Sequence, residues 1–105
     1  MRFVETPVFT RLITEALDDE QYRHLQLALA FRPEQGALIR GSGGLRKLRW
    51  AASGRGKRGG ARVIYYWDRA SESFYMLFVY TKQKQGDLTA AQAKQLGLLV
   101  RKEFK

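Results

Sequence analysis

The spacing of apolar residues at the start of the chain predicts a short strand over residues 2–5 and then a helix. Thr6 and Pro7 are typical of a helix start, because a threonine hydroxyl can accept from backbone N–H groups and proline has no N–H to leave unpaired. The apolar residues behind them recur at helical spacing and form one stripe, which consists of Val8, Phe9, Leu12, Ile13, Ala16 and Leu17.

A second helix is predicted to begin after Asp18, with Gln21 three residues later as its capping-box partner. The buried side of this helix consists of Tyr22, Leu25, Ala28 and Leu29. Pro33 and Gly36 end the helical pattern, because neither residue type favours the continuation of a helix.

From Leu45 onward the apolar spacing changes to two, which is the period of a strand. Leu48 and Trp50 alternate with Lys47 and Arg49, so one face of this strand can meet a core while the other presents cations.

Two runs rich in β-branched and aromatic residues follow, over residues 61–67 and 74–80. The polar turn between them predicts an antiparallel hairpin of two central strands. Thr89 and Gln92 repeat the capping-box pattern and predict a final helix, whose apolar positions are Ala93, Leu96, Leu99, Val100 and Phe104.

These elements predict an α+β fold of a single domain over residues 1–105, in the order β-α-α-β-β-β-α. We expect a mainly antiparallel sheet of about four strands, with two N-terminal helices and one C-terminal helix. If the helices bury their stripes against one face of the sheet, the other face is open for function.

The 105 residues carry a formal net charge of +9, and the excess is concentrated in one segment. Between Arg40 and Arg62 there are eight Lys or Arg residues, no Asp or Glu, and seven of the ten glycines. Such a segment attracts polyanions, because neutralising phosphates releases counterions. A solvated loop without a partner is the alternative. Cations on a strand favour contact with nucleic acid, because the strand fixes their positions.

The composition excludes several kinds of site. There is no cysteine, and the single histidine, His24, lies at the rim of the second predicted helix, so a thiol nucleophile and a ribonuclease with paired histidines are excluded. The G-x-G-x-x-G match at residues 54–59 precedes a strand rather than a helix, so we reject a dinucleotide site. We expect no cofactor and no metal. The apolar runs are too short to span a bilayer and the N-terminus has no secretory signal, so we expect the cytoplasm and no membrane contact.

The basic strands and their loops supply the candidates for nucleic-acid contact, which are Arg46, Arg49, Lys57, Arg58 and Lys84. Most of the tyrosines should belong to the core. Tyr65 and Tyr66 point to opposite faces, so one of them should lie beside Arg62, where it could stack on a base or donate a hydrogen bond; Tyr65 is the candidate. Lys82 and Lys84, two residues apart after the last strand, would share a face near the same cations, and a solvated strand end without a partner is the alternative.

Four segments of the chain form a recognisable combination: RGSGGLRKLRWA, GKRGGARVIYYW, FYMLFVYTK and the DLT that follows at residues 87–89. In these segments, and over essentially its whole length, the chain resembles the RelE/HigB family of bacterial toxins, on the HigB side. The resemblance implies a RelE-like fold and a ribosome-dependent endoribonuclease, an mRNA interferase that inhibits translation. It also implies a cognate antitoxin, commonly a helix-turn-helix protein of the HigA type, through which the toxin is brought to operator DNA.

By position in the family's motifs, the catalytic residues would be Lys47, Arg62 and Lys82, and we expect them to lie together. Lys57 lies in the loop typical of HigB. Attack of the RNA 2′-hydroxyl on the adjacent phosphate builds negative charge, which the planar Arg62 guanidinium would stabilise. Lys47 or Lys82 would act as a base if nearby cations favour a neutral amine, and otherwise both would bind phosphate. This chain has Gln83 where some relatives have arginine, so the acid and base remain open.

Two other functions remain open at the level of the sequence. One is a toxin of the same fold that binds DNA gyrase without chemistry, and the other is an RNA-binding or DNA-binding module that does not cleave.

Overall fold

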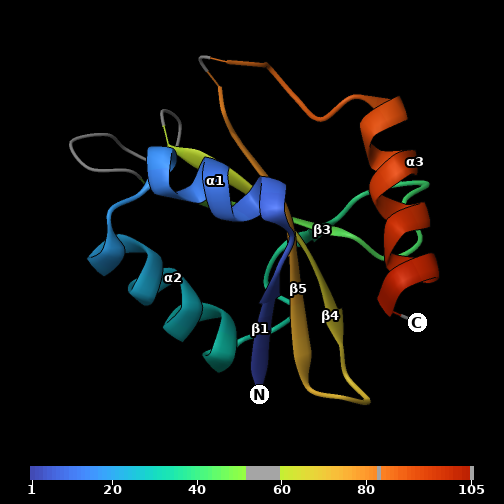
Figure 1. Ribbon diagram of the computed structural model, residues 1–105, viewed down its shortest axis with the longest axis horizontal. Helices are drawn as coiled ribbons and strands as arrows, with labels where there is room; N and C mark the ends of the chain where they lie inside the picture. Colours follow the sequence, from blue (N-terminus) through green and yellow to red (C-terminus); the bar gives the residue numbers. More distant parts are fainter. Residues whose placement is uncertain (52–59, 83, 105) are drawn as a thin grey trace.

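The computed structural model describes residues 1–51, 60–82 and 84–104 and has the predicted α+β class (Figure 1). Its elements are β1 (Arg2–Glu5), α1 (Pro7–Ala16), α2 (Asp19–Phe31), β2 (Ala37–Leu38), β3 (Arg46–Trp50), β4 (Ala61–Asp68), β5 (Ser73–Thr81), α3 (Ala90–Leu99) and the π-helical turn η2 (Val100–Phe104). All the predicted helices and strands are present, within one or two residues of the expected bounds.

The described strands form one mixed sheet of five in the order β1-β5-β4-β3-β2. The strands β2 to β5 pair antiparallel, whereas β1 pairs parallel to β5 at the edge. The sequence did not predict β2, because two residues are too few to show an alternation. The parallel pairing of β1 was also not predicted.

The helix starts have the predicted caps. The Thr6 hydroxyl accepts from the Phe9 N–H at 3.0 Å. Reciprocal capping boxes begin the next two helices, from Asp18 with Gln21 and from Thr89 with Gln92. Each box pairs backbone N–H groups that a helix start otherwise leaves unpaired.

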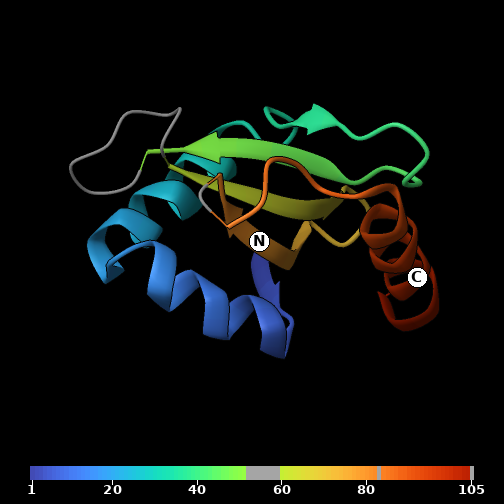
Figure 2. The same cartoon turned by 90° about the horizontal axis from the view of Figure 1, so that it is seen from above.

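The first hydrophobic core lies between one face of the sheet and the helices α1 and α2, which lie on the same side of it (Figure 2). Its fully or nearly fully buried members are Phe9, Ile13, Leu17, Leu25, Leu29, Ala61, Val63, Tyr65, Phe74, Met76 and Val79. The predicted helical stripes therefore face the core, except that Val8 at the start of α1 is 43% exposed.

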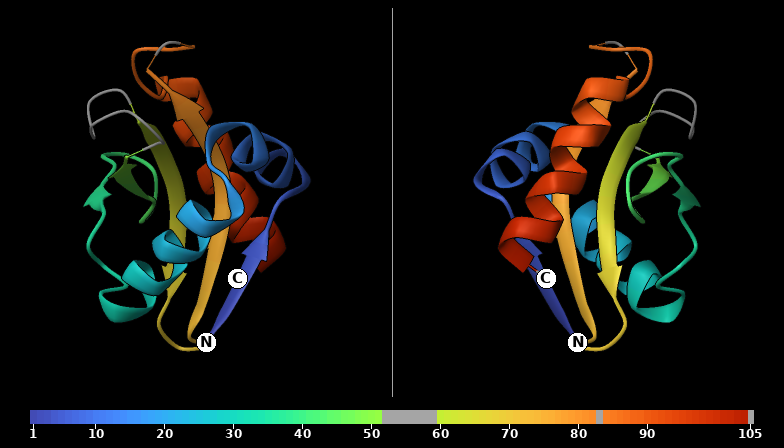
Figure 3. Two further views of the ribbon diagram at one scale, coloured as in Figure 1. Left: turned by 90° about the vertical axis from the view of Figure 1, so that its left-hand side faces the viewer. Right: turned by 90° about the vertical axis from the view of Figure 1, so that its right-hand side faces the viewer.

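A second core lies on the opposite face of the sheet, beneath α3 and η2, and the right-hand view of Figure 3 shows α3 in front of this face. It contains Leu45, Ile64, Tyr75, Leu77, Tyr80 and Val100, with Leu96 of α3 packed against it. The expectation that one whole face is open is therefore wrong. The helix lies close to the loop before β3: a Cβ at Gly97 would lie 2.4 Å from the Ser42 carbonyl oxygen.

A register shift in the β4–β5 ladder decides which residues of β5 face this second core. The pairing moves from Ile64↔Phe78 to Tyr65↔Met76, so Leu77 is an extra residue. Because of this extra residue, Tyr80 pairs with Arg62 and faces the second core with it. Without the bulge, Tyr80 would face the first core. No helix in the described part of the chain is long and apolar enough to cross a membrane.

Candidate functional site

Cations lie at one end of the second sheet face, beside the part that α3 covers. Lys47 and Arg49 are two residues apart in β3, so both point to this face, and Arg49 pairs in register with Arg62 of β4. Arg62 pairs in turn with Tyr80 of β5. We call these four residues, together with Asp87 of the loop before α3, the cationic face.

Asp87 accepts hydrogen bonds from two other residues of the cationic face, Lys47 and Tyr80. Its Oδ1 atom accepts from Lys47 Nζ at 3.1 Å and from the Tyr80 hydroxyl at 3.2 Å. The same oxygen accepts from the Leu88 backbone N–H at 2.8 Å, which fixes the carboxylate relative to its own loop. One carboxylate oxygen thus holds a lysine of β3 and a tyrosine of β5 in place, although it lies 40 residues from the lysine in sequence.

These contacts shift the pKa values of two of the groups. The pKa of Asp87 lies below its ordinary value, because the Leu88 N–H and then Lys47 donate to the ionised carboxylate. The pKa of Tyr80 is raised to about 12, first by burial and then by the negative charge of Asp87. At neutral pH the face therefore holds an ionised carboxylate and a neutral phenol.

Arg62 is only 5% exposed, so the cation expected to stabilise a phosphate lies below the surface. Its Nη1 donates to the Gly60 carbonyl at 3.0 Å. The Arg62 charge acts on the Tyr80 hydroxyl, where it slightly opposes the rise in pKa. A charge in such surroundings is screened less than an exposed one and acts more strongly on a nearby anion.

A cavity of about 270 Å³ opens beside the Lys47–Asp87 ion pair. Its wall includes apolar side chains of β2 and the exposed Arg40, which adds a further cation. The cavity makes this end of the sheet concave, so a ligand can contact Lys47 and Asp87 together.

Two of the residues predicted to contact RNA, Arg46 and Tyr65, lie on the opposite face of the sheet, so the expectation that Tyr65 lies beside Arg62 on an open face is wrong. Arg46 donates through Nη1 to the carbonyls of Glu34 and Gly36, at 3.0 and 2.8 Å. Tyr65 is fully buried; its hydroxyl donates to the Pro33 carbonyl at 2.8 Å and accepts from the Gly36 N–H at 3.0 Å. Both side chains hold the loop after α2 against β3 and β4.

The lysines after β5 lie outside the sheet. The strand ends at Thr81, and the Lys84 N–H donates back to the Thr81 carbonyl at 3.0 Å, which closes a turn. Lys82 and Lys84 are both exposed in this turn, so the expectation that they continue a strand and share its face is wrong. The sheet therefore brings Lys47 and Arg62 onto one face with Arg49, but it does not fix Lys82 there. Lys57 and Arg58 lie outside the described residues.

Asp87 and Tyr80 were not among the predicted site residues. Asp87 appeared only as part of a matched segment, and a loop carboxylate gives no periodic signal. The described residues contain no group of three or more His, Cys, Asp or Glu side chains arranged to hold a metal ion. His24 is exposed on α2, which packs on the other side of the sheet.

The arrangement can stabilise negative charge with cations fixed on two strands, and it offers one carboxylate as a proton acceptor. Lys47 forms an ion pair with Asp87 at 3.1 Å, and a side chain of this kind is suited to binding phosphate. In comparison with known proteins, no family model matches the chain.

Proposed function

We propose that this chain is a toxin of the RelE/HigB type, which inhibits translation by cutting mRNA on the ribosome. The observation that carries the proposal is that cations of two adjacent strands, Lys47, Arg49 and Arg62, lie on one face, where Lys47 lines a cavity. The segment resemblance described above gives this face its proposed substrate. The proposed compartment is the cytoplasm, where translated mRNA is found.

The proposed chemistry is attack of a ribose 2′-hydroxyl on the adjacent phosphorus, with loss of the 5′-oxygen of the next nucleotide. Negative charge grows on the phosphate oxygens as the 2′-oxygen approaches, and Lys47 and Arg62 stabilise this charge. The Asp87 carboxylate is the acceptor for the 2′-hydroxyl proton. The step leaves a 2′,3′-cyclic phosphate, and the departing 5′-oxygen takes its proton from water to become a 5′-hydroxyl. Because its pKa is low, it is a weak base, and charge stabilisation supplies most of the rate.

The resemblance also supports a protein partner, an antitoxin of the HigA type with a helix-turn-helix domain. In this proposal the antitoxin neutralises the toxin and is the component that contacts operator DNA. Substrate geometry is supplied by the ribosome, which explains how a site with few acid–base groups can act.

The test is induced expression in bacteria followed by mapping of mRNA 5′ ends. Wild-type protein is expected to arrest growth and to produce new ends inside translated regions. Lys47→Gln should remove both effects, whereas Lys94→Gln, the same change at an exposed position of α3, should leave both unchanged.

Other outcomes would replace the proposal. Growth arrest with intact messages and broken or trapped DNA would favour a gyrase-binding toxin. No arrest and no cleavage, together with RNA binding that falls steeply with salt, would favour a binding module.

A further inference from the structure

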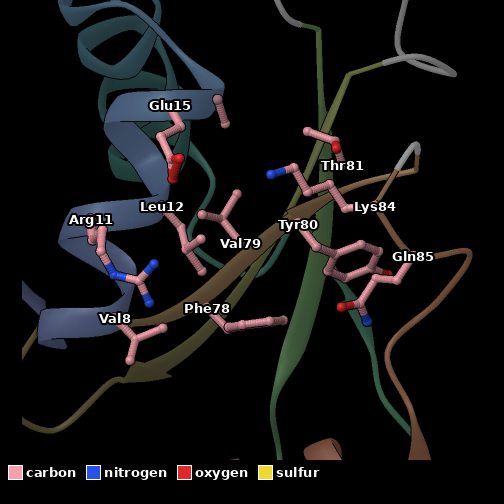
Figure 4. Close-up of a pocket in the computed structure, with 11 residues that line it drawn as sticks. Val8, Arg11, Leu12, Glu15, Phe78, Val79, Tyr80, Thr81, Lys84 and Gln85 are labelled. Carbon is pink, nitrogen blue, oxygen red and sulfur yellow. The ribbon is translucent and has the colours of Figure 1, made fainter.

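A groove lies between α1 and the C-terminal half of β5, at the edge of the sheet (Figure 4). It encloses about 260 Å³ and is lined mainly by apolar side chains, including Val8, Leu12 and Ala16 of α1 and Phe78 and Val79 of β5. Val8, which is 43% exposed, lines this groove. The described residues therefore leave apolar side chains of two elements facing a common space.

On the side away from β4, no described strand pairs with β5 along this groove, although the Thr81 carbonyl at its end accepts from the N–H groups of Lys84 and Gln85. The neighbouring strand β1 pairs only with residues 73–76. Beyond them, Thr6 ends the contact: its N–H donates to the Met76 carbonyl at 3.0 Å and its hydroxyl to the Leu77 carbonyl at 2.9 Å. The strand continues to Thr81, and no described strand lies on that side of its last four residues. An unpaired edge of this kind is a template for a further strand.

The charges at the rim favour an acidic ligand. The side chains of Arg11 and Lys84 reach over the groove from opposite walls (Figure 4). Glu15 is the acidic residue among the lining side chains, so cations outnumber acids there. The formal net charge of the whole chain, +9, acts in the same direction.

We propose that this groove binds an extended segment of a partner protein, in which apolar and acidic residues alternate, as an added strand on β5. In such complexes the backbone hydrogen bonds supply affinity, and pockets for alternate side chains supply specificity. The apolar side chains of the segment would enter the groove, and the acidic ones would face Arg11 and Lys84. A nucleic acid suits the groove less well, because its walls are mainly apolar and Glu15 repels phosphate. The inference goes beyond the proposed function and does not depend on RNA cleavage.

The groove shares residues with the surroundings of the cationic face. Tyr80 is one of the residues that line the groove, and its hydroxyl donates to Asp87. Gln85 also lines the groove, and its Nε2 donates to the Asp87 carbonyl at 2.8 Å. A strand bound to β5 would therefore contact two residues that fix the position of Asp87.

The test uses a displayed library of nine-residue peptides with alternating acidic and apolar positions, and a matched library in which every acidic residue is replaced by lysine. We expect binders from the acidic library alone. In NMR spectra of the full chain, the best peptide should shift amide signals of α1 and of residues 78–85. Val8→Asp should weaken binding about tenfold, as expected when a buried apolar contact becomes a charge. Leu27→Asp, the same kind of change at an exposed position of α2, should change binding less than twofold.

Backbone pairing is tested separately by N-methylation of the selected peptide. Methyl groups on the alternate nitrogens that face β5 should abolish binding, whereas methyl groups on the other nitrogens should not. Three results would overturn the proposal: no binder from the acidic library, signal shifts confined to other surfaces, or equal effects of the two methylation patterns. Shifts of the α1 amide signals on addition of a twelve-nucleotide single-stranded RNA alone would also overturn it, in favour of a nucleic-acid subsite.

Discussion

The Asp87 carboxylate has two effects on the cationic face: its charge repels a phosphate near Lys47, and it is the proposed acceptor for the 2′-hydroxyl proton. Replacement of Asp87 by asparagine separates these effects. The change removes one negative charge from beside Lys47 and keeps the size of the side chain. A phosphate that binds near Lys47 would no longer be repelled, and one charge at about 4 Å contributes about 1 kcal/mol in water, so affinity for RNA should rise roughly fivefold at low salt. Cleavage should fall at the same time, because an amide cannot take up the 2′-hydroxyl proton and its uncharged oxygen accepts more weakly from Lys47 and Tyr80.

The stability of the fold should change little. The side chains of the ion pair are 28% and 71% exposed for Lys47 and Asp87. An exposed pair of this kind contributes about 0–1 kcal/mol, so the melting temperature should move by less than about 6 °C.

Fluorescence anisotropy of a labelled twelve-nucleotide RNA in 50 mM salt measures the affinity, and calorimetry measures the melting temperature. The matched control is Asp68→Asn at the far end of β4, where the carboxylate accepts from Ser71 and lies next to the hairpin turn. This control should bind RNA like the wild type. Weaker RNA binding by Asp87→Asn, or a gain of the same size in Asp68→Asn, would refute the assignment of Asp87 to the phosphate site.

Three further predictions concern the surroundings of the site. Tyr65→Phe removes a hydroxyl that pairs two backbone groups and should lower the free energy of unfolding by about 2 kcal/mol, measured in urea; an unchanged value would contradict its structural role. Tyr80 should ionise near pH 12 in absorbance at 295 nm, and at lower pH in Asp87→Asn. Because folding favours its neutral form, its contribution to stability is complete below pH 10 and is lost as pH rises toward 12; ionisation near 10 would contradict its burial. Gly97→Ala should destabilise the fold by about 1–3 kcal/mol despite the better helix propensity of alanine, because the new methyl group meets the Ser42 carbonyl; a stabilised variant would show that α3 is not packed there.

The helices and strands followed from local physical chemistry. Proline and capping residues at helix starts act within one turn, and the alternation in β3 and the β-branched and aromatic run in β4 depend on adjacent residues, so short-range patterns were sufficient. The two-residue β2 and the parallel pairing of β1 depend on contacts between distant parts of the chain. No local pattern encodes them.

The site was only partly predictable, because alternation along a strand places residues on a face but does not reveal a bulge or the path of a loop. Alternation correctly puts Lys47 and Arg49 on one face, and counting in twos from Arg62 reaches Tyr66, so Tyr65 belongs to the opposite face. The contact of Tyr80 with Asp87 depends on the bulge in β5 and on the path of the loop before α3, and neither produces a periodic signal.

The most direct measurement uses purified ribosomes programmed with a defined message and mapping of the 5′ ends that form. The account predicts cuts within ribosome-bound codons for the wild type and for Lys94→Gln, none for Lys47→Gln, and none when ribosomes are left out. An intact message with the wild-type protein, or equal cutting by Lys47→Gln and Lys94→Gln, would contradict it.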